Sequence, residues 1–134
     1  MKISIVIPNY NGFDLLQKNL PKVISAMDTD LEVKIIIVDD CSSPVEQENL
    51  NKLVSVLDSK IPIKLIKHTK NKGFALTVNT GAFHDPADFY VFLNTDAVPE
   101  NGLVDKALKH CENNETLLGV GFRDDSIEAH HNVH

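Results

Sequence analysis

The sequence predicts an α/β fold in which helices cover both faces of one mostly parallel sheet. Short apolar runs rich in β-branched and aromatic residues lack polar alternation, which is typical of strands buried on both faces. Between them, apolar residues recur three and four positions apart, as in amphipathic helices. This alternation predicts βαβ units with right-handed crossovers. A length of 134 residues favours a single domain over residues 1–134.

The predicted elements alternate along the chain. Strands are expected at residues 3–8, 33–38, 63–66, 89–93 and 117–122. Helices are expected at residues 13–27, 44–57, 75–83 and 103–111. The last residues, 123–134, carry neither a helical stripe nor a strand pattern.

Two helices carry local signals that refine their boundaries. Pro21 lies inside the first helix and is expected to kink or split it near Leu20, because proline has no backbone N–H to donate. The second helix has a well-marked start, with Ser43 as N-cap, Pro44 at the first helical position and Glu46 three residues after the cap.

Composition excludes several classes of protein. Thirteen Lys and Arg against nineteen Asp and Glu give a net charge of -6, which disfavours binding to nucleic acid or to anionic membranes. No apolar run approaches the roughly 20 residues that span a bilayer. Cys41 and Cys111 are too few for a disulfide scaffold or a zinc site, so a reducing, cytoplasmic setting is expected. The histidines in residues 130–134 are interpreted as a surface tail rather than a metal site.

Polar residues follow four of the predicted strands. In open parallel sheets, ligands bind beyond the carboxyl ends of the strands, where the strand order reverses. The segments that leave those ends are residues 8–12, 39–43, 68–74 and 94–99, all rich in polar side chains. Each segment also has a structural interpretation, as a helix cap, a glycine turn or an Asx turn. Their convergence on one edge nevertheless favours a site for a polar small molecule.

Four segments resemble the N-terminal signatures of glycosyltransferase family 2, in the family's order and at its usual separations. They read IVIPNYNG at 5–12, IIVDDCSS at 36–43, NKGFALTVNTG at 71–81 and FLNTDAVP at 92–99. The resemblance covers residues 2 to about 122 and implies a Rossmann-like sheet of the GT-A type. It also implies a nucleotide diphospho-sugar as the donor substrate.

The resemblance assigns the donor to residues at the strand ends and on the third helix. These donor-binding residues are Pro8, Asn9, Tyr10, Asn11, Asp39, Asp40, Lys72, Gly73, Asn79, Asn94 and Thr95. Asp40, with Asp39 beside it, matches the carboxylate that accepts a hydrogen bond from the nucleobase. An imide or amide N–H of uracil or guanine suits such an acceptor.

A divalent cation, Mg²⁺ or Mn²⁺, is the expected cofactor. The segment Asn94-Thr95-Asp96 occupies the family's D-x-D position, and it departs from that pattern because Asn94 replaces the first aspartate. Asp96 is therefore the expected anionic metal ligand. Such a cation stabilises the charge that builds on a diphosphate leaving group, and it takes oxygen ligands from carboxylates, phosphate and water.

The resemblance implies inverting transfer to a hydroxyl acceptor, either a saccharide or a lipid-linked group. That reaction needs a general base, which the family places downstream of the D-x-D position. No catalytic residue is assigned here, since Asp124 and Asp125 are interpreted as solvated loop residues. We therefore expect a donor-binding half that does not transfer sugar alone.

Two alternative functions remain, a non-catalytic nucleotide-binding module and a GT-A-like nucleotidyltransferase. The nucleotidyltransferase would need a glycine-rich basic loop, which residues 9–13 lack.

Overall fold

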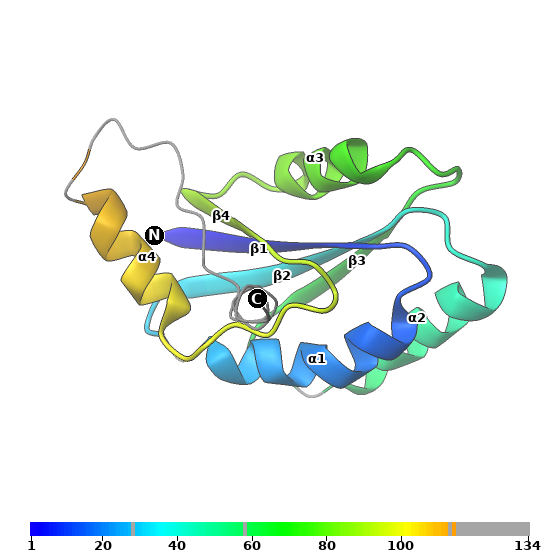
Figure 1. Cartoon of the computed structure of the whole chain (residues 1–134), viewed down its shortest axis with the longest axis horizontal. Helices are drawn as coiled ribbons and strands as arrows, with labels where there is room; N and C mark the ends of the chain where they lie inside the picture. The colour runs from blue at the N-terminus through cyan, green and yellow to red at the C-terminus, as the bar shows by residue number, and fades with distance from the viewer. Residues whose placement is uncertain (28, 58, 113, 115–134) are drawn as a thin grey trace, which may run out of the picture. The chain divides into compact units, whose positions relative to one another are not determined.

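The computed structural model describes residues 1–27, 29–57, 59–112 and 114 (Figure 1). Its elements are β1 (Lys2–Asn9), α1 (Phe13–Ala26), β2 (Glu32–Asp39), α2 (Pro44–Val56), β3 (Ile63–Lys67), α3 (Phe74–His84), β4 (Phe89–Phe92) and α4 (Leu103–Glu112). The predicted strand at 117–122 lies outside the described residues. The chain divides into two compact units, Met1–Gly102 and a second that begins at Leu103. A single domain over residues 1–134 stays a prediction.

The first unit is an α/β layer structure, which confirms the predicted fold class. Its four described strands are parallel and stand in the order β3-β2-β1-β4. The chain therefore moves outward from β1 to β3 and then returns to the other side of β1. A right-handed crossover in the reverse direction must use the opposite face of the sheet. Accordingly, α1 and α2 cover one face and α3 covers the other (Figure 1).

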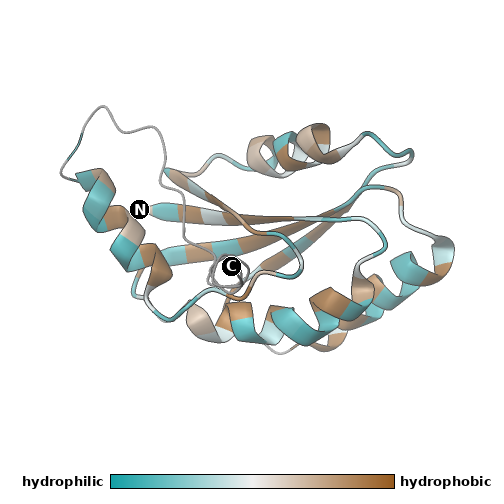
Figure 2. Ribbon diagram, viewed as in Figure 1, coloured by the Kyte–Doolittle hydropathy of each residue, from teal (hydrophilic) through white to brown (hydrophobic). Residues whose placement is uncertain are grey.

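The core is centred on β1 and β2. Side chains such as Ile5, Val6, Ile35 and Ile37 are fully buried, because both strands are paired on both sides and covered on both faces. The middle residues of both strands are hydrophobic and appear brown in Figure 2, between hydrophilic residues toward the two ends. Burial of these apolar side chains is the main favourable term in folding, at about 1.5–3 kcal/mol for each.

The helix α1 corrects one prediction. It runs without a break from Phe13 to Ala26, so it is not split near Leu20, and a kink at Pro21 stays a prediction. Proline removes one backbone hydrogen bond, but the stripe containing Leu16, Leu20 and Val23 is buried on both sides of it and anchors the helix against the sheet.

The start of α2 confirms the predicted cap and adds an unexpected contact. The Ser43 hydroxyl accepts from the backbone N–H of Glu46, and Pro44 opens the helix. The Glu46 carboxylate accepts from the backbone N–H of Phe13 at 3.0 Å instead of turning back to Ser43. Glycine at the α1 N-cap, Gly12, offers no side chain, so Glu46 supplies the acceptor and the negative charge that this helix end needs. None of the helices in the described residues is long and apolar enough to span a lipid bilayer.

Candidate functional site

A cavity of about 560 Å³ opens at the carboxyl ends of the strands in the first unit. It lies where parallel sheets of this topology bind ligands, because the strand order reverses between β1 and its neighbours. The lining residues come from all four strand ends and from the starts of α1 and α3: Pro8, Asn9, Tyr10, Leu15, Asp40, Asn71, Gly73, Phe74, Thr77, Asn94, Thr95 and Asp96.

Most of the residues expected at the site line this cavity, and four do not. Asn11, Asp39, Lys72 and Asn79 lie outside the lining. Lys72 contributes its backbone N–H to Asp40 while its side chain is exposed, and Asn79 is exposed on α3. Leu15, Asn71, Phe74 and Thr77 also line the cavity, although no sequence motif assigned them individually to the site.

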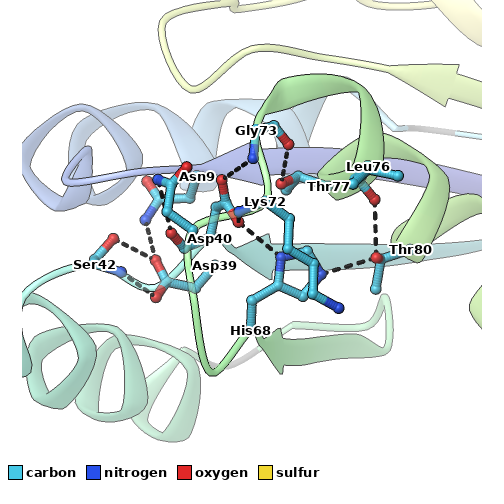
Figure 3. Close-up of polar contacts among 11 residues, drawn as sticks. Asn9, Asp39, Asp40, Ser42, His68, Lys72, Gly73, Leu76, Thr77 and Thr80 are labelled. Carbon is cyan, nitrogen blue, oxygen red and sulfur yellow. Dashed lines mark hydrogen bonds and ion pairs between the residues drawn. The ribbon is translucent and has the colours of Figure 1, made fainter.

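Asp40 is the most heavily bonded group in the cavity wall. Its Oδ1 accepts from the backbone N–H of Lys72 at 2.8 Å and lies 2.8 Å from Nδ1 of His68, while Oδ2 accepts from the N–H of Gly73 at 2.9 Å (Figure 3). Only 4% of Asp40 is exposed. The loop after β3 therefore wraps around this carboxylate and is fixed by it.

These hydrogen bonds set the charge of Asp40. Burial raises the pKa of the carboxyl group, but hydrogen bonds from His68 and from the backbone N–H groups of Lys72 and Gly73 outweigh that effect. The pKa of Asp40 is therefore held below its ordinary value of 3.8. Asp40 is an anion at neutral pH and can only accept hydrogen bonds.

Asp39, its neighbour in sequence, is a structural residue turned away from the cavity. Its carboxylate accepts from the backbone and hydroxyl of Ser42, at 3.0 and 2.6 Å, and from the Asn9 amide at 2.9 Å (Figure 3). Asp39 is completely buried. It ties the loop after β2 to the end of β1 and does not cap α2, whose N-cap is Ser43.

The loops after β1 and β2 are laced together by further contacts. The backbone N–H of Asn11 donates to the Ser42 hydroxyl at 2.8 Å, and the Asn11 side-chain oxygen accepts from Ser43 N–H at 3.1 Å. Asn11 and Cys41 have positive φ values of 50° and 60°, which allow both loops to turn sharply. Asn11 therefore does not line the cavity but holds the loop after β2 in place through Ser42 and Ser43.

Asn94, Thr95 and Asp96 form a tight turn after β4. The backbone N–H of Ala97 donates to the Asn94 carbonyl at 3.1 Å, and the Asn19 amide donates to the Thr95 carbonyl at 2.9 Å. Asn19 is buried on α1, so this helix fixes the turn. A Cβ atom on Gly12 would come within 2.7 Å of Asn9 Oδ1 and 3.4 Å of Thr95 Oγ1, so glycine there permits the close approach of the two loops.

The Asp96 carboxylate is available to a ligand. Asp96 is exposed at the cavity, and its side chain makes no hydrogen bond within the part of the chain that the structure describes. The described residues contain no group of three or more His, Cys, Asp or Glu that could hold a metal alone. One carboxylate and the Asn94 amide oxygen do fit Mg²⁺ or Mn²⁺, because such cations take their remaining ligands from phosphate and water.

The chain matches a known family over most of its length. Residues 4–133 match the sequence model described as Glycosyl transferase family 2. The chain belongs to this family. An uncharacterized glycosyltransferase of Mycoplasma genitalium is 36% identical over 42 residues, which are 31% of this chain and 14% of that protein. The family membership favours a glycosyltransferase over the nucleotidyltransferase alternative.

Solved structures share the fold. Residues 1–349 of TarS from S. aureus superpose with a TM-score of 0.70 at 19% identity, covering 92% of this chain and 39% of that one. The mannosyltransferase PcManGT of Pyrobaculum calidifontis, solved with GDP-Man and Mn²⁺, gives 0.71 at 21% identity, covering 81% of this chain and 32% of that one. These likenesses confirm the Rossmann-like GT-A fold. This family 2 chain spans less than two fifths of either structure.

Proposed function

We propose that this chain is the donor-binding part of a family 2 glycosyltransferase, with residues 1–134 as one donor-binding domain. The cavity would take a nucleotide diphospho-sugar, and the whole enzyme would transfer its sugar to a hydroxyl group of a saccharide or lipid-linked acceptor with inversion. One observation carries the proposal: the same cavity holds a buried anionic acceptor, Asp40, and an exposed carboxylate without a partner in the described residues, Asp96. A cytoplasmic location is part of the proposal.

The nucleoside would bind between the ends of β1, β2 and α3. Tyr10 and Phe74 line the cavity with 59% and 66% of their surface exposed, which offers apolar ring faces to a base. Asp40 would accept an N–H of that base. A crystal structure of TarS with UDP-GlcNAc and the structure of PcManGT with GDP-Man support a nucleotide-sugar as the ligand.

The diphosphate would lie toward the turn after β4, where Asp96 and Asn94 would hold the divalent cation. When bound, Mg²⁺ or Mn²⁺ neutralises charge on the diphosphate leaving group. The Asn19 contact with Thr95 and the absence of a side chain at Gly12 would keep this turn at a fixed distance from the nucleoside.

A general base for the acceptor hydroxyl has no candidate in the cavity wall. Among the lining residues, the carboxylates are Asp40 and Asp96. Asp40 is engaged by several donors and has a lowered pKa, so it is a poor proton acceptor, and Asp96 is assigned to the cation. Asp124 and Asp125 lie outside the described residues. We therefore expect donor binding by the 134-residue chain without appreciable transfer to an acceptor.

Calorimetric titration of UDP and GDP, with Mn²⁺ and with a chelator, tests the proposal. We expect at least one of the two to bind more tightly with Mn²⁺. Asp96→Asn should remove most of that gain, about 10–100-fold in affinity by comparison with disturbed metal sites, and should change stability by less than about 1 kcal/mol.

The matched control is Asp30→Asn, which removes the same charge from an exposed loop before β2, at the other end of the strands. Its affinity and its Mn²⁺ dependence should equal those of the parent. Absence of binding by either nucleotide would overturn the proposed function. Binding by Asp96→Asn that equals the parent in Mn²⁺ would overturn the metal assignment alone.

A further inference from the structure

The carboxylate of Asp40 has nearly all of its acceptor capacity filled. An ionised carboxylate offers about four lone-pair positions on its two oxygens. The Lys72 N–H and His68 Nδ1 occupy both positions on Oδ1, and the Gly73 N–H occupies one on Oδ2. One position on Oδ2 remains for a further donor.

Thr77 also lies near the Asp40 carboxylate, and its hydroxyl has a single hydrogen. That hydroxyl donates to the Gly73 carbonyl at 2.7 Å, one turn back along α3. Because this bond keeps its hydrogen satisfied, Thr77 can leave the Oδ2 position to a ligand without losing a partner of its own. Both Thr77 and Asp40 line the cavity.

His68 is what closes Oδ1 to a ligand. Its side chain is 4% exposed and bridges two elements, with Nδ1 at 2.8 Å from Asp40 Oδ1 and Nε2 at 2.8 Å from Thr80 Oγ1 on α3 (Figure 3). Since Asp40 is ionised and only accepts, His68 Nδ1 must carry the hydrogen and donate it. Thr80 in turn fixes the orientation of the ring.

The nucleobases differ in how many donors they present at the edge opposite the sugar. Uracil and thymine offer one ring N–H between two carbonyl oxygens. Guanine offers two adjacent donors, a ring N–H and an exocyclic NH₂, and a pair of donors side by side needs both oxygens of a carboxylate. Adenine and cytosine present a ring nitrogen lone pair, which an anionic acceptor repels.

Asn71 adds the donor that a uracil edge requires. Its amide nitrogen donates one hydrogen to the Asp40 backbone carbonyl at 3.3 Å and retains a second. Asn71 lines the same cavity. A donor beside a single acceptor matches a carbonyl beside a ring N–H; uracil satisfies this pair fully, whereas guanine leaves its second donor without a partner.

We propose that Asp40 selects a uracil-type base over guanine, because His68 and Lys72 leave it one acceptor position, and that His68 is a positioning residue for this selection. The inference rests on the proposed function and deepens it by naming the donor as a uridine or thymidine diphosphate sugar. An unsatisfied guanine donor should weaken binding on the order of tenfold.

Titration of the full chain with UDP, GDP and ADP in Mn²⁺ tests the selection. UDP should bind at least about tenfold more tightly than GDP, and ADP should bind most weakly of the three. Equal affinity for UDP and GDP would overturn the inference and leave the proposed function standing. Failure of every nucleotide to bind would overturn the proposed function instead.

Two substitutions at position 68 test the role of the histidine. His68→Leu removes the donor and frees Oδ1, so the ratio of UDP to GDP affinity should fall toward one. His68→Asn keeps an N–H near the place of Nδ1 and should restore much of the ratio, while His84→Asn, at an exposed histidine on the same α3, should leave it unchanged. A purely structural role for His68 predicts that both affinities fall together at an unchanged ratio, and that result would overturn the positioning role. The ratio of the parent chain decides the base selection even if His68→Leu does not fold.

Discussion

Cys41 lies in the loop between β2 and α2, in a backbone conformation that costs free energy. Its φ of 60° places it in the left-handed region, where a residue with a Cβ atom is disfavoured by roughly 1–2 kcal/mol. Glycine removes that cost in the folded state, but it also lowers the free energy of unfolding by about 0.5–1 kcal/mol because it increases the conformational entropy of the unfolded chain. Cys41→Gly should therefore stabilise the protein by up to about 1 kcal/mol, measured by urea denaturation.

Two controls separate backbone strain from other effects at this turn. Cys41→Ala keeps a Cβ atom and should give no gain. Asn11→Gly, at the other left-handed position, also removes the acceptor for the Ser43 N–H and should destabilise. A gain from Cys41→Ala as large as that from Cys41→Gly would show that strain is not the cause.

At the residue scale, the different roles of the adjacent Asp39 and Asp40 could not be predicted from the sequence. Asp39 ends β2 and Asp40 follows it, and the family resemblance implied that both lie near a base. The distinction depends on partners distant in the chain, Asn9 and Ser42 for the first and His68 for the second. A lone histidine after β3 carries no local signal of this partnership, so His68 was not predicted as part of the site.

At the scale of elements, α3 packs tightly against the central strands at Gly81. A Cβ atom on Gly81 would lie 2.4 Å from Val6 Cγ1 and 3.1 Å from Val38 Cγ2. Both valines are buried in β1 and β2 and have little freedom to move. Although alanine favours an isolated helix, Gly81→Ala should therefore destabilise the protein by about 1–3 kcal/mol.

The matched control for this prediction is Asn79→Ala in the same helix. Asn79 is exposed, so the change should be neutral or should stabilise by up to about 0.5 kcal/mol. Thermal or urea denaturation of both variants measures the difference. Equal stability of Gly81→Ala and the parent would mean that α3 can shift away from the sheet at little cost.

Element identities were predictable because each apolar pattern is local, whereas their neighbours in space were not. The strands and helices of the first unit occur in the predicted order, with ends displaced by a few residues at most. The pairing of β4 with β1 is set by the crossover of α3, which no single segment specifies. Leu15 and Phe74 also escaped prediction, because each lies in the first turn of a helix, on a face exposed at the cavity.

For the first unit as a whole, the polar network at the sheet edge joins loops that are distant in sequence. Asp40 connects the end of β2 to the loop before α3, and its own backbone N–H donates to the Asn9 carbonyl at 2.8 Å. The network therefore contributes to the stability of the fold as well as to the cavity. The sequence predicted the edge of the sheet, because parallel strands must end together, but the network itself depends on the tertiary structure.

The charge of Asp40 should make global stability depend on pH in the acid range. Its pKa in the folded protein lies below the ordinary 3.8, so the unfolded chain binds a proton more readily. The stabilisation is complete above about pH 4 and is lost as the pH falls through the lower, folded-state value.

Asp40→Asn should lower the free energy of unfolding by about 2–3 kcal/mol at pH 7, since it weakens hydrogen bonds to a buried anion. The difference in free energy of unfolding between this variant and the parent should narrow as the pH falls below 3.8. Urea denaturation between pH 3 and 7 measures both curves, with Asp30→Asn as an exposed control whose curve should follow the parent. A gap that stays constant across this range would mean that the hydrogen bonds to Asp40 do not favour its ionised form.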